Sequence, residues 1–118
     1  MQWIILIGDR NLTLDSVKAI KHFDSIKSYD VPEMGARYCV DYGDDHIFYD
    51  YEDGEDAIRD FEKEDLRKIP FSNIHTITMV YQSEERMKKI LRQENFLRGI
   101  FVNDNYDNIM PIEEFIKV

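Results

Sequence analysis

Several residue types that often reveal a function are scarce in this sequence of 118 residues. The single cysteine, Cys39, excludes an internal disulfide and a zinc site built from cysteines. Because Cys39 lies in an apolar strand pattern, we interpret it as a small buried side chain. The three histidines, His22, His46 and His75, lack the spacing of metal ligands. We therefore predict neither a metal site nor a cofactor.

The glycine and serine motifs of common enzymes are also missing. Gly8 follows the first apolar run alone, without the further glycines or the lysine of a phosphate-binding loop. No serine lies in the sequence context of a nucleophile elbow. A receiver-like phosphorylation domain would carry paired acids after its first strand, where only Asp9 is present. We therefore do not predict an enzyme, although a site assembled from residues distant in sequence stays open.

Long hydrophobic runs are absent. A membrane span needs about 20 apolar residues, and no stretch approaches that length. The first run, Trp3–Ile7, has five apolar residues and no preceding lysine or arginine, unlike a signal peptide. We therefore expect a cytoplasmic protein with no membrane partner. Hydrophobic residues make up 43% of the chain, and no linker or repeat divides it, which predicts a single globular domain over residues 1–118.

Apolar periodicity predicts both strands and helices. Short apolar runs predict strands at 3–7, 26–31, 36–42, 46–51, 74–81 and 100–102. Helices are expected after Thr13, over residues 55–68 with a break near Glu64, and after Ser83. The hydroxyls of Thr13 and Ser83 can accept hydrogen bonds from free backbone N–H groups at a helix start. Residues 103–108 form a predicted polar turn, and residues 112–118 form either a last strand or a helical turn.

The predicted order of elements is β-α-β-β-β-α-β-α-β. Two strand–helix–strand units favour an α/β fold with a mixed, partly parallel sheet and helices on its faces. Ala36–Tyr42 and His46–Tyr51 flank Gly43-Asp44-Asp45, a pattern typical of an antiparallel hairpin. We expect this hairpin at one edge of the sheet.

The negative charge of the chain is concentrated in one segment. The formal net charge is −9. Residues 41–65 hold twelve acids and two bases, a net charge of −10, whereas the remainder sums to +1. Nucleic acid is therefore not an expected ligand, because phosphate binding depends on cationic side chains. A basic protein is the more compatible partner.

Tyrosines alternate with acids in the predicted hairpin. Tyrosine supplies contact area with few rotatable bonds, and carboxylates steer basic partners. We therefore predict a small acidic protein-binding module, for which toxin-neutralising immunity proteins are one physical instance. The predicted docking residues are Asp41, Tyr42, Asp44, Asp45, Tyr49, Asp50, Tyr51 and Asp53. The simpler alternative is a solvated charged edge that blocks unwanted strand pairing.

Two other functions stay open. Ligands of parallel sheets bind beyond the carboxyl ends of the strands, so a small-molecule site or an active site would use Asp9, Arg10, Gln82, Ser83, Asn103 and Asp104. These residue types also favour ordinary turns and caps. The chain could instead be a self-associating structural subunit, a homodimer in which the basic helix face with Lys88, Lys89 and Arg92 receives an acidic hairpin from a second copy.

Overall fold

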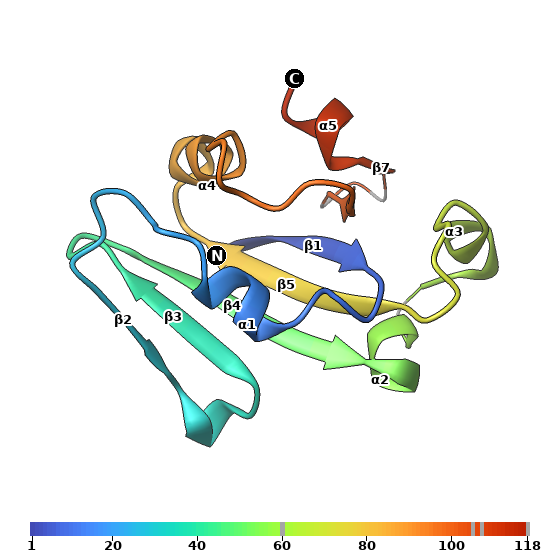
Figure 1. The fold of residues 1–118 in the computed structure, drawn as a ribbon, viewed down its shortest axis with the longest axis horizontal. Coiled ribbons are helices and arrows are strands. Elements are labelled where there is room, and N and C mark those ends of the chain that lie inside the picture. Colours follow the sequence, from blue (N-terminus) through green and yellow to red (C-terminus); the bar gives the residue numbers. More distant parts are fainter. Residues whose placement is uncertain (60, 105, 107, 118) are drawn as a thin grey trace.

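The computed structural model describes residues 1–59, 61–104, 106 and 108–117 (Figure 1). Within these residues, the strands form one seven-stranded sheet in the order β2-β3-β4-β5-β1-β6-β7. The strands are β1 (Gln2–Gly8), β2 (Lys27–Asp30), β3 (Arg37–Asp41), β4 (His46–Asp53), β5 (His75–Tyr81), β6 (Phe101–Asn103) and β7 (Ile109–Pro111). The α-helices are α1 (Leu14–Lys18), α2 (Gly54–Ile58), α3 (Lys63–Arg67), α4 (Glu84–Leu91) and α5 (Ile112–Phe115), and a short 3-10 helix spans Pro32–Met34.

The prediction of a partly parallel sheet is wrong, because every pair of neighbouring strands in the described residues is antiparallel. Strands β5 and β6 are joined through α4 and run in the same direction. However, β1 lies between them and pairs antiparallel with both. Strands β1 and β2, joined through α1, also run in the same direction, with β5, β4 and β3 between them. In both cases the helix connects two strands that run in the same direction but are not neighbours in the sheet.

The predicted hairpin is confirmed as an antiparallel pair. Tyr38 pairs with Tyr49 and Val40 pairs with Ile47 across β3 and β4. Gly43 in the connecting turn has a φ of +88°, a left-handed conformation that glycine adopts without steric cost. The hairpin does not lie at an edge, however, because β2 covers β3 and β5 pairs with β4.

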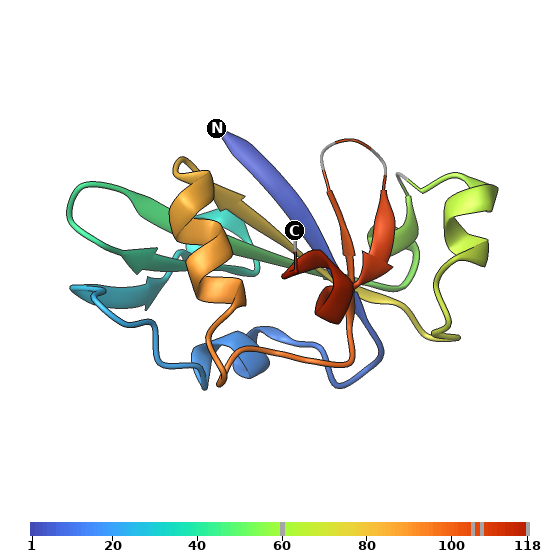
Figure 2. The same ribbon diagram turned by 90° about the horizontal axis from the view of Figure 1, so that it is seen from above.

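The main core lies on one face of the sheet. Alternate side chains of the central strands are buried in it, among them Ile4, Leu6, Val40, Ile47, Tyr49, Ile77 and Met79. The helices add Val17 of α1, Leu91 of α4 and Ile112 of α5, all fully buried. Figure 2 shows α4 and α5 side by side over the strands. This face is therefore covered, and its side chains are not available to a partner.

The helix starts were predicted better than the helix ends. Ser83 is the N-cap of α4, and its Oγ accepts a hydrogen bond from the backbone N–H of Arg86 at 3.1 Å. Thr13 is the N-cap of α1, but this helix ends at Lys18. The expected helix over 55–68 is two helices, with the break before Lys63 rather than near Glu64.

The structure contains one strand near the end of the chain that was not predicted. The predicted tail forms the helical turn α5, and the preceding β7 was not expected. Residues Asn105 and Asp107 of the predicted polar turn and Val118 of the tail lie outside the described residues.

The opposite face of the sheet carries a row of apolar side chains that crosses five strands. The strand register places Tyr29, Cys39, Phe48, Val80 and Trp3 beside one another, and we call them the apolar row. Trp3 is 51% exposed and Tyr29 42% exposed, whereas Cys39 is buried as predicted. This face therefore presents aromatic surface to solvent.

Candidate functional site

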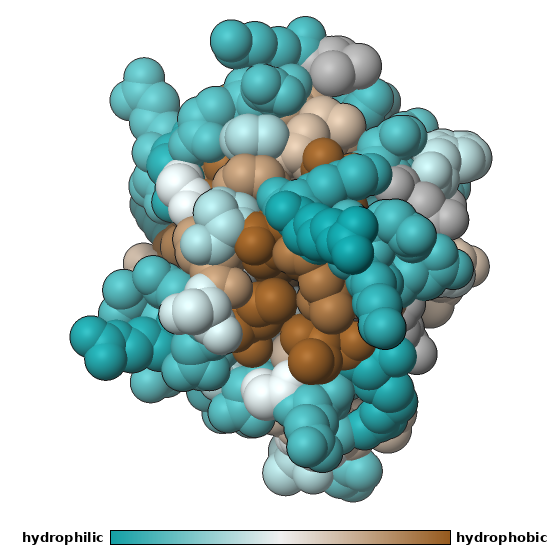
Figure 3. All heavy atoms as spheres, turned by 90° about the vertical axis from the view of Figure 1, so that its right-hand side faces the viewer, coloured by the Kyte–Doolittle hydropathy of each residue, from teal (hydrophilic) through white to brown (hydrophobic). Residues whose placement is uncertain are grey.

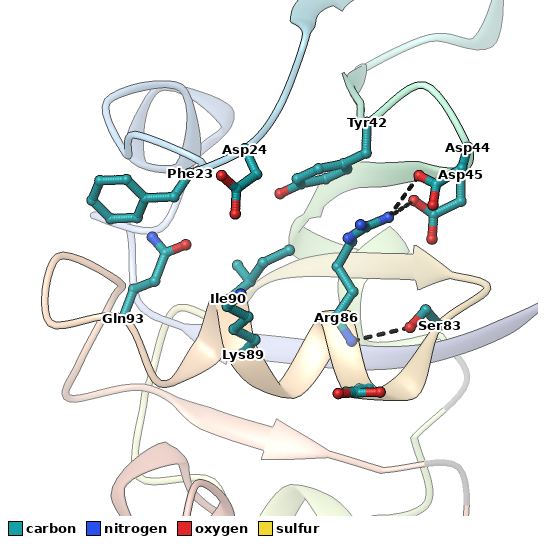
Figure 4. Close-up of a pocket in the computed structure, with 11 residues that line it drawn as sticks. Phe23, Asp24, Tyr42, Asp44, Asp45, Ser83, Arg86, Lys89, Ile90 and Gln93 are labelled. Carbon is teal, nitrogen blue, oxygen red and sulfur yellow. Dashed lines mark hydrogen bonds and ion pairs between the residues drawn. The ribbon is translucent and has the colours of Figure 1, made fainter.

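The turn of the β3–β4 hairpin lies against the first turn of α4 in the same chain (Figure 4). Arg86 Nη1 donates to Asp44 Oδ1 at 3.1 Å and also to Asp45 Oδ1. Asp45 is buried, Arg86 is half-buried and Asp44 is exposed. The Arg86 guanidinium holds the pKa of Asp44 below its usual range. The two acids of the hairpin turn therefore neutralise Arg86, a residue of α4 in the same chain.

The ring of Tyr42 completes this contact. The Arg86 guanidinium carbon lies 4.4 Å from the ring centroid, within the range of a cation–π interaction. Tyr42 is buried, and its hydroxyl has no hydrogen-bond partner among the described residues. Burial raises the pKa of Tyr42 to about 12. Tyr42 is thus an interior ring beside Arg86 rather than a tyrosine on an open surface.

A pocket of about 360 Å³ opens between this hairpin turn, α4 and the loop that precedes β2. It is lined by Phe23, Asp24, Tyr42, Asp44, Asp45, Ser83, Glu85, Arg86, Lys89, Ile90 and Gln93. Asp24 has a φ of 70°, in the left-handed region that is uncommon for residues other than glycine. In Figure 4 the Asp24 carboxylate is drawn next to the hydroxyl end of Tyr42, and, besides burial, its negative charge contributes to the raised pKa of Tyr42. The pocket therefore joins polar groups from three segments that are distant in sequence.

The other two tyrosines of the predicted docking site are also bound within the fold. Tyr49 is fully buried, and its hydroxyl shares a hydrogen bond of 2.7 Å with Nε2 of His22. Tyr51 is half-buried, and its hydroxyl shares a hydrogen bond of 2.7 Å with Nδ1 of His75. Tyr42, Tyr49 and Tyr51 therefore pack within the fold and do not form an exposed aromatic surface.

The remaining predicted acids lie at separate places. Asp41 Oδ1 accepts a hydrogen bond from the backbone N–H of Gly43 at 2.7 Å and so shapes the turn. Asp50 accepts two hydrogen bonds from Arg37, at 2.6 and 2.8 Å, on the face of the apolar row. Asp53 is exposed at the end of β4. The predicted acidic hairpin is therefore divided among the turn, the second face of the sheet and the end of a strand.

The residues of the alternative ligand site are separated by the antiparallel pairing. The last residue of β1 pairs with the first residue of β5. Asp9 and Arg10 therefore lie at the opposite end of β5 from Gln82 and Ser83. Ser83 caps α4, as described above, while Asp9 Oδ1 accepts from the backbone N–H of Asn11 at 2.8 Å. These are the local roles that such residues commonly take in turns and caps.

Asn103 and Asp104 lie at the end of β6. Asn103 is buried, and its Oδ1 has no hydrogen-bond partner among the described residues. Asp104 Oδ1 accepts from the backbone N–H groups of Tyr106 at 2.8 Å and Asn108 at 3.0 Å. Asp104 also lines a pocket with Tyr81 of β5, so the ends of β5 and β6 do lie at the same end of the sheet. Four of the six predicted residues, all but Asp9 and Arg10, therefore lie at the same end of the sheet.

Apart from Asp44, the exposed acids of segment 41–65 among the described residues lie after the middle of β4. Six of them lie in or next to α2 and α3, and we call this surface the acidic end: Glu52, Asp53, Glu55, Asp56, Glu62 and Glu64. Three apolar residues of the same stretch, Ile58, Phe61 and Leu66, stay partly exposed. Figure 3 views the side of the molecule where α2 and α3 lie, and it shows a hydrophobic hollow surrounded by hydrophilic side chains. Asp60 of the predicted acidic set lies outside the described residues.

Sequence reasoning missed Arg86 and Asp24. A signal existed for Arg86, because it is a base in the first turn of a helix, where the dipole favours acids. Such a base is stabilised by nearby carboxylates, which the hairpin turn supplies. No sequence pattern marked Asp24, because its left-handed backbone becomes visible only in the structure.

No protein-family model, curated protein or solved structure matches the chain. Within the described part of the chain, no group of three or more His, Cys, Asp or Glu side chains is arranged to hold a metal ion. The same residues include no helix of the length and apolar character needed to cross a membrane. The function must therefore be argued from the surfaces and pockets themselves.

Proposed function

We propose that this chain is a small acidic protein-binding module that docks a basic protein through the acidic end. The observation that carries the proposal is that exposed carboxylates are interspersed with the partly exposed Ile58, Phe61 and Leu66 along residues 52–66. This stretch lies on the side of the molecule where Figure 3 shows a hydrophobic hollow. An apolar centre with a polar rim is the usual anatomy of a protein interface. We include a cytoplasmic setting in the proposal, because the only cysteine, Cys39, is a buried free thiol.

The charge of the acidic end supports a basic partner. Residues 52–65 hold eight acids and two bases, a net charge of −6. Within the acidic end, Arg59 pairs with Asp56, and both side chains are exposed. Asp44, Asp45 and Asp50 are paired with arginines elsewhere in the fold. Exposed carboxylates that lack such a neighbour accelerate and orient association with a basic surface.

The test is affinity capture with matched charge-reversal variants. The first variant carries Glu55→Lys, Glu62→Lys and Glu64→Lys. The control carries Asp15→Lys, Glu33→Lys and Glu94→Lys, three exposed acids outside the acidic end, and has the same net charge. A basic protein captured by wild type and control, but lost by the first variant, supports the proposal. The captured protein is then purified, and calorimetry should show its affinity falling about tenfold or more in the first variant.

Other outcomes decide against this surface. Equal loss in both variants would mean that binding follows net charge alone. Full retention in the first variant would remove the acidic end as the docking site, and an Asp44→Lys variant would then test the hairpin turn. Circular dichroism of each variant keeps loss of fold separate from loss of binding.

Self-association is a second candidate, and the apolar row favours it. A chain with a net charge of −9 repels its own copies. Two copies should therefore associate most favourably through a face on which the charged side chains already form ion pairs. Arg37 is bound to Asp50 beside the apolar row, and His46 Nε2 lies 3.5 Å from Asp41 Oδ1. Sedimentation should show a dimer that Trp3→Lys dissociates, and a monomer at all concentrations would exclude this candidate.

A further inference from the structure

The hydroxyl of Tyr42 is the least explained polar group of the pocket beside α4. Buried polar groups almost always have a hydrogen-bond partner. The Tyr42 side chain is more than nine-tenths buried, and its hydroxyl has no partner among the described residues. Arg86 contacts the ring face of Tyr42 and leaves the hydroxyl free. A tyrosine hydroxyl is protonated at neutral pH, so it can both donate and accept a hydrogen bond.

Asp24 brings a carboxylate to the same place. Its backbone is held in the left-handed region, at a φ of 70°. Aspartate is among the residues other than glycine that adopt this region most often. Figure 4 shows the Asp24 carboxylate next to the Tyr42 hydroxyl, and both line the pocket. The Asp24 carboxylate therefore lies beside a buried hydroxyl to which it makes no hydrogen bond.

The rest of the pocket selects the chemistry of a ligand. Arg86 is neutralised by Asp44 and Asp45, so it leaves little positive charge for an anion. Ile90 and Phe23 give apolar surface on the side of the pocket near Asp24. This combination suits a cation with a short apolar stem.

We propose that this pocket binds a small aliphatic amine, with the ammonium group between the Asp24 carboxylate and the Tyr42 hydroxyl. The ammonium group donates to both oxygens, and the alkyl chain lies against Ile90 and Phe23. The Tyr42 hydroxyl thereby accepts a hydrogen bond, where it has no partner in the free protein. The ligand has to move the exposed Asp24 side chain slightly, because the Tyr42 hydroxyl is sealed from water.

The test is an NMR titration of the backbone amides with putrescine, with butanediol as the uncharged control of equal length. Putrescine should shift the amides of Asp24, Tyr42 and Ile90, and butanediol should not. Asp24→Asn should weaken binding about tenfold, because asparagine tolerates the left-handed backbone but lacks the charge. Asp15→Asn makes the same change in net charge on α1 and should alter the affinity less than about twofold.

Two further variants sharpen the result. Tyr42→Phe should weaken putrescine binding severalfold while the amide spectrum of the free protein stays that of a folded domain. Lys89→Met should strengthen binding, because it removes a like charge from the pocket lining. The proposal is overturned by the absence of shifts at millimolar putrescine, by equal shifts with butanediol, or by equal weakening in Asp24→Asn and Asp15→Asn.

Discussion

Replacing Arg86 by methionine tests how strongly the hairpin turn is fixed to α4. The change leaves the carboxylate of Asp45, which is 9% exposed, without its cation. Removal of one partner from a buried ion pair costs roughly 3–5 kcal/mol. The Arg86 side chain is 29% exposed, so water can partly replace it, and we expect the unfolding free energy to fall by about 2–3 kcal/mol. Asp44 is 76% exposed and should add little.

Urea unfolding measures this loss directly. A domain of this size has an unfolding free energy of roughly 5–15 kcal/mol, so the change lies well within the range of the assay. The denaturant slope should stay constant, because methionine keeps most of the packing of the arginine stem. The matched control is Lys88→Met, which breaks only the pair with Glu84, 3.7 Å apart on the surface of the same helix. That variant should lose about 0.5 kcal/mol or less.

A double-mutant cycle separates the ion pair from packing. Asp45→Asn combined with Arg86→Met removes both charges, and the double variant should be more stable than the sum of the single losses predicts. The coupling energy should be about 1–3 kcal/mol. A loss below about 0.5 kcal/mol for Arg86→Met, or additive single effects, would refute the view that this contact fixes the hairpin.

Three smaller predictions concern single groups. Tyr42→Phe removes an unpartnered hydroxyl, so urea unfolding should show a loss below about 0.5 kcal/mol, and a loss above about 1 kcal/mol would reveal a hidden hydrogen bond. Burial lowers the pKa of His22 from 6.5, so the unfolded chain takes up the proton first, and stability should fall as the pH drops below that value. His22→Gln should flatten that pH dependence. Gly43→Ala places a β-carbon at a φ of +88° and 2.6 Å from Cδ1 of Ile26, and the unfolding free energy should fall by about 1–2 kcal/mol.

Local features of the fold could be predicted from the sequence because they depend on neighbouring residues. At the N-cap Ser83 the hydroxyl accepts from the backbone N–H of Arg86, and at the N-cap Thr13 the backbone N–H donates to the hydroxyl of Ser16. The hairpin follows from alternation on two adjacent strands and from a glycine in the turn. The buried state of Cys39 follows from its apolar strand context. Each of these signals lies within one short stretch of sequence, the longest of which is the hairpin over residues 36–51.

The strand order could not be predicted, because it depends on which distant segments pair. The unit β5-α4-β6 has the sequence pattern of a parallel crossover, yet β1 is inserted between its strands. The parallel interpretation placed Asp9 and Ser83 at one edge of the sheet. Antiparallel pairing placed them at opposite ends of β5, so the error in topology passed directly to the candidate ligand site.

The position of the hairpin tyrosines had a signal in the sequence. Alternation puts Tyr42 and Tyr49 on the same face as Val40 and Ile47, both fully buried. The other face carries Arg37 and Asp50, which form an ion pair. Aliphatic β-branched neighbours on the tyrosine side therefore indicated the covered face of the sheet. The mixture of tyrosines and acids along the hairpin hides this difference between the covered face and the other face unless the two faces are considered separately.

The distribution of paired and unpaired charge leads to a last prediction, which distinguishes the two candidate interfaces. The acids of the hairpin turn are bound to Arg86, while those of the acidic end face solvent. Exposed charges are screened over a Debye length of about 8 Å at 0.15 M salt. Binding of a basic partner at the acidic end should therefore weaken steadily as salt is added.

Contact between copies through the apolar row should respond in the opposite direction. Salt screens the repulsion between two chains of net charge −9 and leaves the burial of Trp3 and Phe48 unaffected. Calorimetry of the partner complex and sedimentation of the free chain, each at low and high salt, measure the two responses separately. A partner whose affinity does not change with salt would show that carboxylates do not carry the interaction, and it would transfer the binding role to the apolar row.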